Sequence, residues 1–287
     1  MRIIRITGLS VSLILAALPG AAGSQTARTS PAPAPSFALT YADLADLAFP
    51  APVVAQVRIA NAARLKPSEA PGLAAGRTRF YVQADVISLI RGPGQMPARV
   101  SYLADLPNEP DGKPTRLRKK DERLIFAQVV PGRPGELRLV APDAQIAALP
   151  ADAARLRAIL REATAPGAAP RITGIGKAFH VPGSLPGESE TQVFLLTAEN
   201  RPVSLNIVRR PGEAPRWSVA LTEIVDESAA APSRDSLLWY RLACGLPRAL
   251  PPLSLADVSA AEAAAIRSDY RLVLDQLGTC ARTRRRA

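Results

Sequence analysis

The sequence predicts an α+β protein that is mostly antiparallel β, with a small barrel in its first half and a β-meander with C-terminal helices in its second half. Three observations support this fold class. Apolar and polar residues alternate in several short runs, which is typical of strands with one buried face. The 28 prolines among 287 residues favour many short elements joined by rigid loops. Helical spacing of apolar residues is limited to a few short stretches.

The first half begins with a helix and a strand. Thr40 has the pattern of a helix N-cap, and apolar residues follow it at helical spacing until Pro50. The run Val53–Ala60 is predicted to be the first strand, and a loop with Pro and Gly occupies residues 66–77. These elements lead into the central strands of the barrel.

The barrel is centred on the stretch from Arg79 to Ile90. Its apolar residues alternate with polar ones until Val86, after which both faces are apolar. A buried strand end or a β-bulge would explain this slip in the alternation. The turn-forming residues 91–94 then end the strand. Three further strands are predicted at Val100–Leu103, Leu124–Val130 and Glu136–Val140.

The order of these elements resembles the netrin/TIMP-like module. A short Asp- and Leu-rich helix precedes the strand VVAQVRIANA, the strand FYVQADVISLIRG ends in a glycine turn, and RLIFAQVV leads into a fifth strand. The resemblance covers residues 40–149 and implies a five-stranded barrel of the OB type. The usual cysteines of that family are absent, including the N-terminal cysteine with which its metalloprotease inhibitors chelate zinc. The resemblance therefore carries over the fold and no functional residue.

The second half is predicted to be an antiparallel β-meander closed by two helices. A helix over Asp152–Glu162 ends the first half, and a linker of Ala, Pro and Gly follows it. Glu199-Asn200 suits a tight hairpin turn between two strands. Ser259 opens the last helix with a capping box, and Gly278 ends it. The strands are expected at 172–181, 191–198, 203–208 and 217–221, and the first of the two helices at 235–243.

These boundaries divide the chain into five parts. We expect a leader at 1–24, an extended Pro/Ala-rich spacer at 25–38, an OB-like barrel domain with flanking helices at 39–163, a meander with two helices at 171–281, and a disordered basic tail at 282–287. The sequence leaves open whether the two β regions are separate domains or one fused sheet system.

The N-terminus has the organisation of a secretory signal peptide. Arg2 and Arg5 precede a short apolar run, Leu9–Leu18, and small residues lead to a cleavage zone near Gly23 and Ser24. The alternative is an uncleaved anchor, but the apolar run is too short to span a bilayer stably. We therefore expect a periplasmic or secreted protein of bacterial type, with no transmembrane segment once the leader is removed.

The two cysteines fit an oxidising compartment. Cys244 and Cys280 make an even count, which predicts one disulfide bond in an exported protein. They lie at the ends of the two predicted C-terminal helices, so the bond would join those ends. The alternative is a pair of free buried thiols.

The chain is strongly basic. Its formal charge of +11 falls to +9 when Arg2 and Arg5 leave with the leader. A basic exported protein tends to meet anionic lipid, anionic polymer or an acidic protein. The 5% of aromatic residues gives little support to a stacking platform for nucleic acid. The densest basic run could bind the phosphate or sulfate groups of an anion, although its composition favours the alternative, a solvated hairpin tip. Its residues are Arg116, Arg118, Lys119, Lys120 and Arg123.

Few residues could support catalysis. His180 is the only histidine, so a Ser-His-Asp triad would have to use it, and Ser184 and Glu188 lie near it in sequence. No Gly-x-Ser-x-Gly motif is present and nothing in the sequence orients His180, so we expect a structural or surface role for it. Glu190 and Glu223 could hydrolyse glycosides if they faced each other across a cleft. The alternative is charge balance against nearby arginines. The acidic set in this half comprises Glu188, Glu190, Glu223, Asp226 and Glu227.

A second set of oxygen ligands lies in the loop after Leu103. Asp105, Asn108, Glu109 and Asp111 could ligate calcium, but the three prolines of the loop oppose a geometry that wraps around an ion. We predict no metal and no cofactor.

These features favour an exported, non-enzymatic binding protein whose partner is an envelope protein or an anionic polymer or lipid surface. Two alternatives are a hydrolase that uses acidic residues of the second half and a structural component of the envelope.

Overall fold

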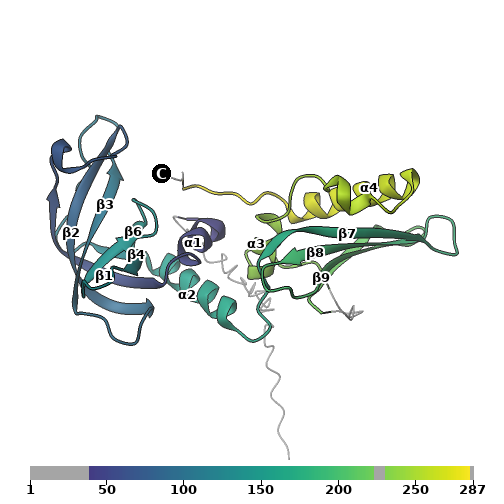
Figure 1. Cartoon of the computed structure of the whole chain (residues 1–287), viewed down its shortest axis with the longest axis horizontal. Helices are drawn as coiled ribbons and strands as arrows, with labels where there is room; N and C mark the ends of the chain where they lie inside the picture. The colour runs from purple at the N-terminus through teal and green to yellow at the C-terminus, as the bar shows by residue number, and fades with distance from the viewer. Residues whose placement is uncertain (1–38, 223–229, 285–287) are drawn as a thin grey trace, which may run out of the picture. The chain divides into compact units, whose positions relative to one another are not determined.

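The computed structural model of the chain describes residues 39–222 and 230–284. It contains a closed five-stranded barrel, followed by a four-stranded antiparallel sheet with C-terminal helices, which confirms the predicted α+β class (Figure 1). The predicted leader and spacer lie outside the described residues.

The first helix, α1 (Tyr41–Ala48), begins at the predicted cap. The Asp43 amide donates to the Thr40 hydroxyl, and the Thr40 amide donates to the Asp43 carboxylate, both at 3.1 Å. This capping box satisfies two amides at the helix start that would otherwise lack a partner. The helix buries Leu44 and Leu47.

The barrel has the five-stranded OB-like arrangement that the sequence predicts. The strand order is β1-β2-β3-β5-β4, and β4 also pairs with β1, which closes the ring. The β3–β5 pairing is parallel and the others are antiparallel. A sixth strand beside β4 was not predicted, because three residues are too few to show alternation. The strands are β1 (Val53–Arg64), β2 (Arg77–Arg91), β3 (Arg99–Pro107), β4 (Glu122–Val129), β5 (Glu136–Leu139) and β6 (Gln145–Ala147).

Strand β2 bends through bulges, as the slip in its alternation predicts. The neighbouring residues Val54 and Ala55 of β1 pair with Arg91 and Leu89, so Ile90 between them has no partner on β1. Ile87 is left without a β1 partner in the same way. Bulges bend a strand and increase its twist, so they help β2 to follow the curvature of the barrel. A short 3₁₀ turn, η1 (Pro67–Glu69), lies in the loop between β1 and β2.

Helix α2 (Pro150–Thr164) starts with a proline at its first position and has an apolar face. Leu156 and Leu160 pack into the core of the barrel, and Ile159 packs against Tyr41 and Leu44 of α1. The helix therefore shares one core with the barrel and a second with α1.

The second sheet has the order β10-β9-β8-β7 with antiparallel pairings throughout, which confirms the predicted meander. The turn at Glu199-Asn200 is looser than expected. The loop between β8 and β9 spans residues 198–202, with Asn200 at φ 54°. The strands are β7 (Ile172–Pro182), β8 (Ser189–Thr197), β9 (Val203–Arg209) and β10 (Arg216–Ala220).

Two helices follow the second sheet, α3 (Leu237–Ala243) and α4 (Ala260–Leu277), with an unpredicted 3₁₀ turn, η2 (Pro252–Leu255), between them. The Ser259 capping box and the glycine end of α4 are both as predicted, and Gly278 has φ 69°. Figure 1 shows α4 along one face of the sheet, where its apolar residues share a core with β8 and β9.

The disulfide between Cys244 and Cys280 is present and joins the end of α3 to the residues after α4, as predicted. Its Cα atoms are 5.2 Å apart. No helix in the described part of the chain is long and apolar enough to cross a membrane.

The prediction of a disordered tail is wrong for residues 282–284. Arg282 and Thr283 make hydrogen bonds to Asp46 and Asp43 of α1. The basic composition suggested disorder, but buried carboxylates elsewhere in the fold give these residues fixed partners. Residues 285–287 lie outside the described part of the chain.

We expect the double change Cys244→Ser and Cys280→Ser to lower the free energy of unfolding by roughly 4 kcal/mol, because the bond closes a loop of 36 positions in the unfolded chain. Urea denaturation of the oxidised wild type, the reduced wild type and the double variant measures this. Coincident unfolding curves for all three would contradict the expectation.

Candidate binding groove

The barrel wall opens between β3 and β5. The two strands pair only at Ser101 with Glu136 and at Tyr102 with Leu137. The next backbone contact is the Asp105 amide to the Pro142 carbonyl, at 2.7 Å. Four residues, 138–141, therefore span a distance that β3 covers with two, and the strands separate.

This separation forms a groove of about 420 Å³, within the range of ligand sites. Tyr81 of β2 and Leu103 of β3 stand opposite each other in register and are 39% and 47% exposed. Tyr102 and Leu137 form a buried floor because alternate residues of a strand point to opposite faces. The groove thus joins an apolar floor to two large exposed apolar side chains.

One edge of the groove carries a buried ion pair between neighbouring strands. Arg79 of β2 lies opposite Asp105 of β3, with Nε–Oδ1 at 2.6 Å and Nη2–Oδ2 at 2.8 Å. These hydrogen bonds raise the pKa of Arg79. Its Nη1 also donates to the Pro71 carbonyl at 3.1 Å. Both charges are satisfied within the protein, so the pair gives the groove a fixed edge, and Glu136 and Arg138 are the other charged residues of its lining.

The floor residue Tyr102 is anchored inside the barrel. Its hydroxyl donates to Gln145 Oε1 at 2.9 Å, and burial raises the pKa of the phenol. Tyr102 therefore stays neutral at ordinary pH. Its ring is held rigidly beneath the groove.

The predicted anion-binding residues do not converge on one site. Arg116 and Arg118 border a polar hollow of about 530 Å³ together with Lys113 and three carboxylates, those of Glu109, Asp111 and Asp121. Lys119 and Lys120 are exposed and do not line this hollow. Arg123 is the second residue of β4, where its Nη2 donates to Asp121 at 3.1 Å. Positive and negative side chains alternate here, so a bound anion would also face carboxylates.

His180 is more ordered than the sequence suggests. Its Nδ1 lies 2.8 Å from the hydroxyl of Thr191, which donates to the buried carboxylate of Asp269 on α4. Asp269 also accepts from Arg209 Nε at 2.7 Å. Because the Thr191 hydroxyl gives its hydrogen to Asp269, His180 Nδ1 is the donor in this chain. The network ties α4 to three strands of the second sheet.

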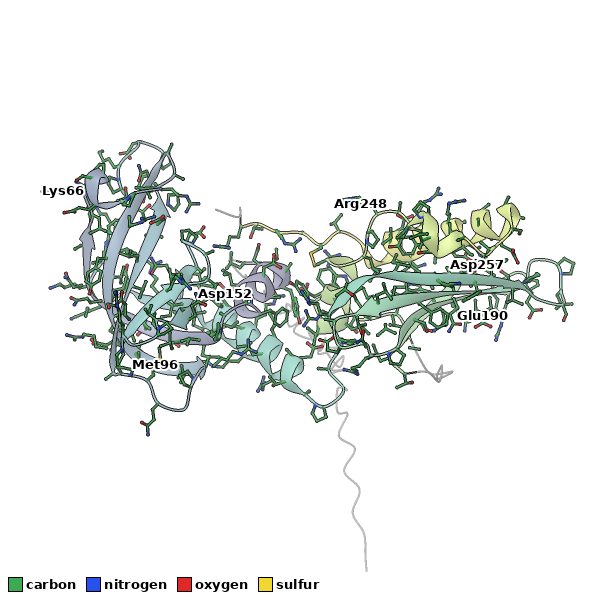
Figure 2. All side chains as sticks on the ribbon, in the orientation of Figure 1. Lys66, Met96, Asp152, Glu190, Arg248 and Asp257 are labelled. Carbon is green, nitrogen blue, oxygen red and sulfur yellow. A yellow bond between two sulfur atoms is a disulfide. The ribbon has the colours of Figure 1, made fainter. Side chains whose placement is uncertain are left out.

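The other catalytic arrangements are not assembled among the described residues. Glu188 accepts from the amides of Ser184 and Leu185 and so caps its own loop. Figure 2 shows Glu190 on the side of the sheet away from α4, where it is exposed. Glu223, Asp226 and Glu227 lie outside the described residues.

The suggested calcium ligands have separate partners. Asp105 pairs with Arg79, Asn108 accepts from the Thr78 hydroxyl at 2.7 Å, and Asp111 pairs with Lys113. Glu109 borders the polar hollow described above. Within residues 39–222 and 230–284, no cluster of three or more His, Cys, Asp or Glu side chains could hold a metal ion.

Sequence reasoning missed the groove residues. The alternation around Leu103 gave one usable signal, since an apolar residue at an outward position is unusual on the exposed face of a strand. The groove itself depends on where β3 and β5 separate. These two strands are distant in sequence, so the local pattern of residues does not reveal the position at which they separate. No known protein-family model matches the chain, and no curated protein matches it either.

We expect Arg79→Ala to cost about 3 kcal/mol of unfolding free energy, because it leaves the buried Asp105 carboxylate without its partner. The matched control is Arg99→Ala, which breaks the Asp85–Arg99 pair on the same two strands. Those side chains are 50% and 63% exposed, so little stability should be lost. Equal losses in the two variants, measured by urea denaturation, would show that burial does not set the strength of these pairs.

Proposed function

We propose that this chain is an exported, non-enzymatic binding protein that holds an extended segment of a partner protein of the cell envelope. The segment would lie in the groove between β3 and β5. The observation that carries this proposal is the exposure of Tyr81 and Leu103 beside a preformed apolar floor. Exposed aromatic and aliphatic side chains at a concave site are the usual anchors of protein recognition.

The chemistry of the groove favours a peptide with apolar side chains. Covering Leu103 and Tyr81 would each contribute roughly 1 kcal/mol by removing apolar area from water, because both side chains are already more than half buried. The walls at 103–104 and 138–141 are not paired with each other, so their backbone groups are suited to an extended strand. The Arg79–Asp105 pair is already satisfied and adds no preference for a charged ligand.

A partner protein is better supported than an anionic surface. The basic loop at 116–123 is interleaved with carboxylates, which weakens its field. Export is supported by the predicted leader and by the disulfide, since such bonds persist in oxidising compartments. The strand order also supports the proposed likeness to the netrin/TIMP-like module, from which no functional residue is transferred.

The groove proposal is tested by selecting displayed random peptides on the full-length oxidised protein. We expect Leu103→Glu to weaken the selected peptides at least tenfold, because it places a charge in the apolar groove. The control is Ile87→Glu. Ile87 is also an exposed apolar residue, with 40% exposure, but it lies on β2 outside the groove. Fluorescence anisotropy measures both affinities. Peptides that bind both variants equally, or no selectable peptide at all, would overturn the groove as the binding site.

The anionic-surface alternative is tested with vesicles that contain phosphatidylglycerol. We expect alanine at Arg116, Arg118, Lys119 and Lys120 to weaken vesicle binding no more than alanine at four exposed arginines elsewhere. Both variants remove four charges, so general attraction falls equally. If the loop variant bound the vesicles at least tenfold more weakly than the control variant, an anion site in the loop would be established. The control positions are Arg64, Arg248, Arg267 and Arg271.

A further inference from the structure

One wall of the groove separates it from a second, smaller hollow. Val140 and Ala141 line the groove on one side and a space of about 200 Å³ on the other, where Arg284 of the tail also lies. The tail is therefore next to the wall on the side away from the groove.

The backbone holds this wall at its two ends and once between them, at Pro142. The Val140 amide donates to the Phe126 carbonyl, and the Phe126 amide donates to the Ala144 carbonyl, both at 3.0 Å. Residues 141–143 loop out between these two points. The position of that loop sets the width of the groove, because Pro142 contacts β3 through the Asp105 amide.

Side chains hold the loop at Asp143. Asp143 pairs with Arg284 of the tail and lies 3.5 Å from Arg77 Nη2. Arg77 Nη1 also donates to the carbonyl of Asp105 on β3, at 3.1 Å. Arg77 thus joins the two walls, and Arg284 holds Asp143 from outside. All three charged side chains are mostly buried.

The tail is itself anchored to α1. Asp43 accepts from the amide and hydroxyl of Thr283, at 3.0 and 2.7 Å, and from the amide of Arg284, at 3.1 Å. Burial alone would raise the pKa of Asp43, but the hydrogen bonds from Thr283 and Thr40 outweigh burial and lower it. Asp46 accepts from Arg282 Nε at 2.6 Å.

The disulfide limits how far the tail can leave this position. With the bond intact, Cys280 is fixed two residues before Arg282. Without it, the last fixed residue is Leu277 at the end of α4, five residues before Arg282. Loop-closure entropy for this lengthening predicts roughly fourfold weaker docking of the tail after reduction.

We infer that residues 282–284 act as a clasp that fixes the wall of the groove at 141–143, and that the disulfide strengthens the clasp. Reduction in the surroundings of the protein would then loosen the groove. The effect on partner affinity rests on the proposed function, whereas the effect on the wall does not.

The wall is tested first without any ligand, by hydrogen–deuterium exchange of the full-length oxidised protein. Arg284→Ala should speed exchange in peptides covering residues 138–145, Arg284→Lys should restore part of the protection, and Arg248→Ala should change nothing. Reduction of the wild type should give a smaller increase in the same peptides. Unchanged exchange in Arg284→Ala, or an increase spread over the whole barrel, would overturn the clasp.

The affinity is tested second, with a peptide selected on the wild-type groove. Arg284→Ala should weaken it roughly 3- to 30-fold, as coupled sites do, and Arg284→Lys should recover part of the loss. Faster exchange with unchanged peptide affinity would reject the link between clasp and groove. If no peptide can be selected, the proposed function fails while the exchange result still decides the clasp.

Discussion

The short parallel contact between β3 and β5 is the constraint on which the rest of the barrel depends. The ring of this barrel is continuous only because β5 pairs with both β3 and β4, and β5 has four residues for this task. Two residue pairs close the wall at one end, and the remainder of β3 has no strand beside it on that side. A barrel with a longer β5 would have a continuous wall there and no groove.

Side chains replace the backbone pairing that this wall lacks. Arg79 and Asp105 join β2 to β3 along the edge of the opening, and Arg77 reaches across it from β2 to Asp143. The second sheet uses the same device, since Arg209 and Thr191 fasten the buried Asp269 of α4 to the strands. Arg77, Arg79 and Arg209 are therefore used to hold elements of the fold together. Their pairing leaves the formal net charge of +11 unchanged, because that figure already subtracts every Asp and Glu.

The sequence predicted what depends on neighbouring residues and missed what depends on distant ones. The cap at Thr40, the bulged alternation of β2 and the ends of α4 follow from local chemistry, and each is present. The disulfide followed from a count of two cysteines. The groove did not follow, because it requires the register of β3 against β5. The tail was wrongly expected to be disordered because arginine-rich composition carries no information about the aspartates that bind it.

The distances in sequence between these partners also constrain how the barrel forms. Thr283 contacts Asp43 across 240 positions, and Arg284 contacts Asp143 across 141. Contacts of this length are costly to form, because the chain must lose the entropy of a large loop. The pairing of the barrel strands uses none of these contacts, whereas Asp143 in the wall pairs with Arg284. The disulfide brings the tail to α3, and α3 is already tied to α1 by the Tyr240 hydroxyl and Asp46 at 2.7 Å. Oxidation therefore shortens the free chain before Arg282, and the wall of a site in the first half is completed by residues 282–284.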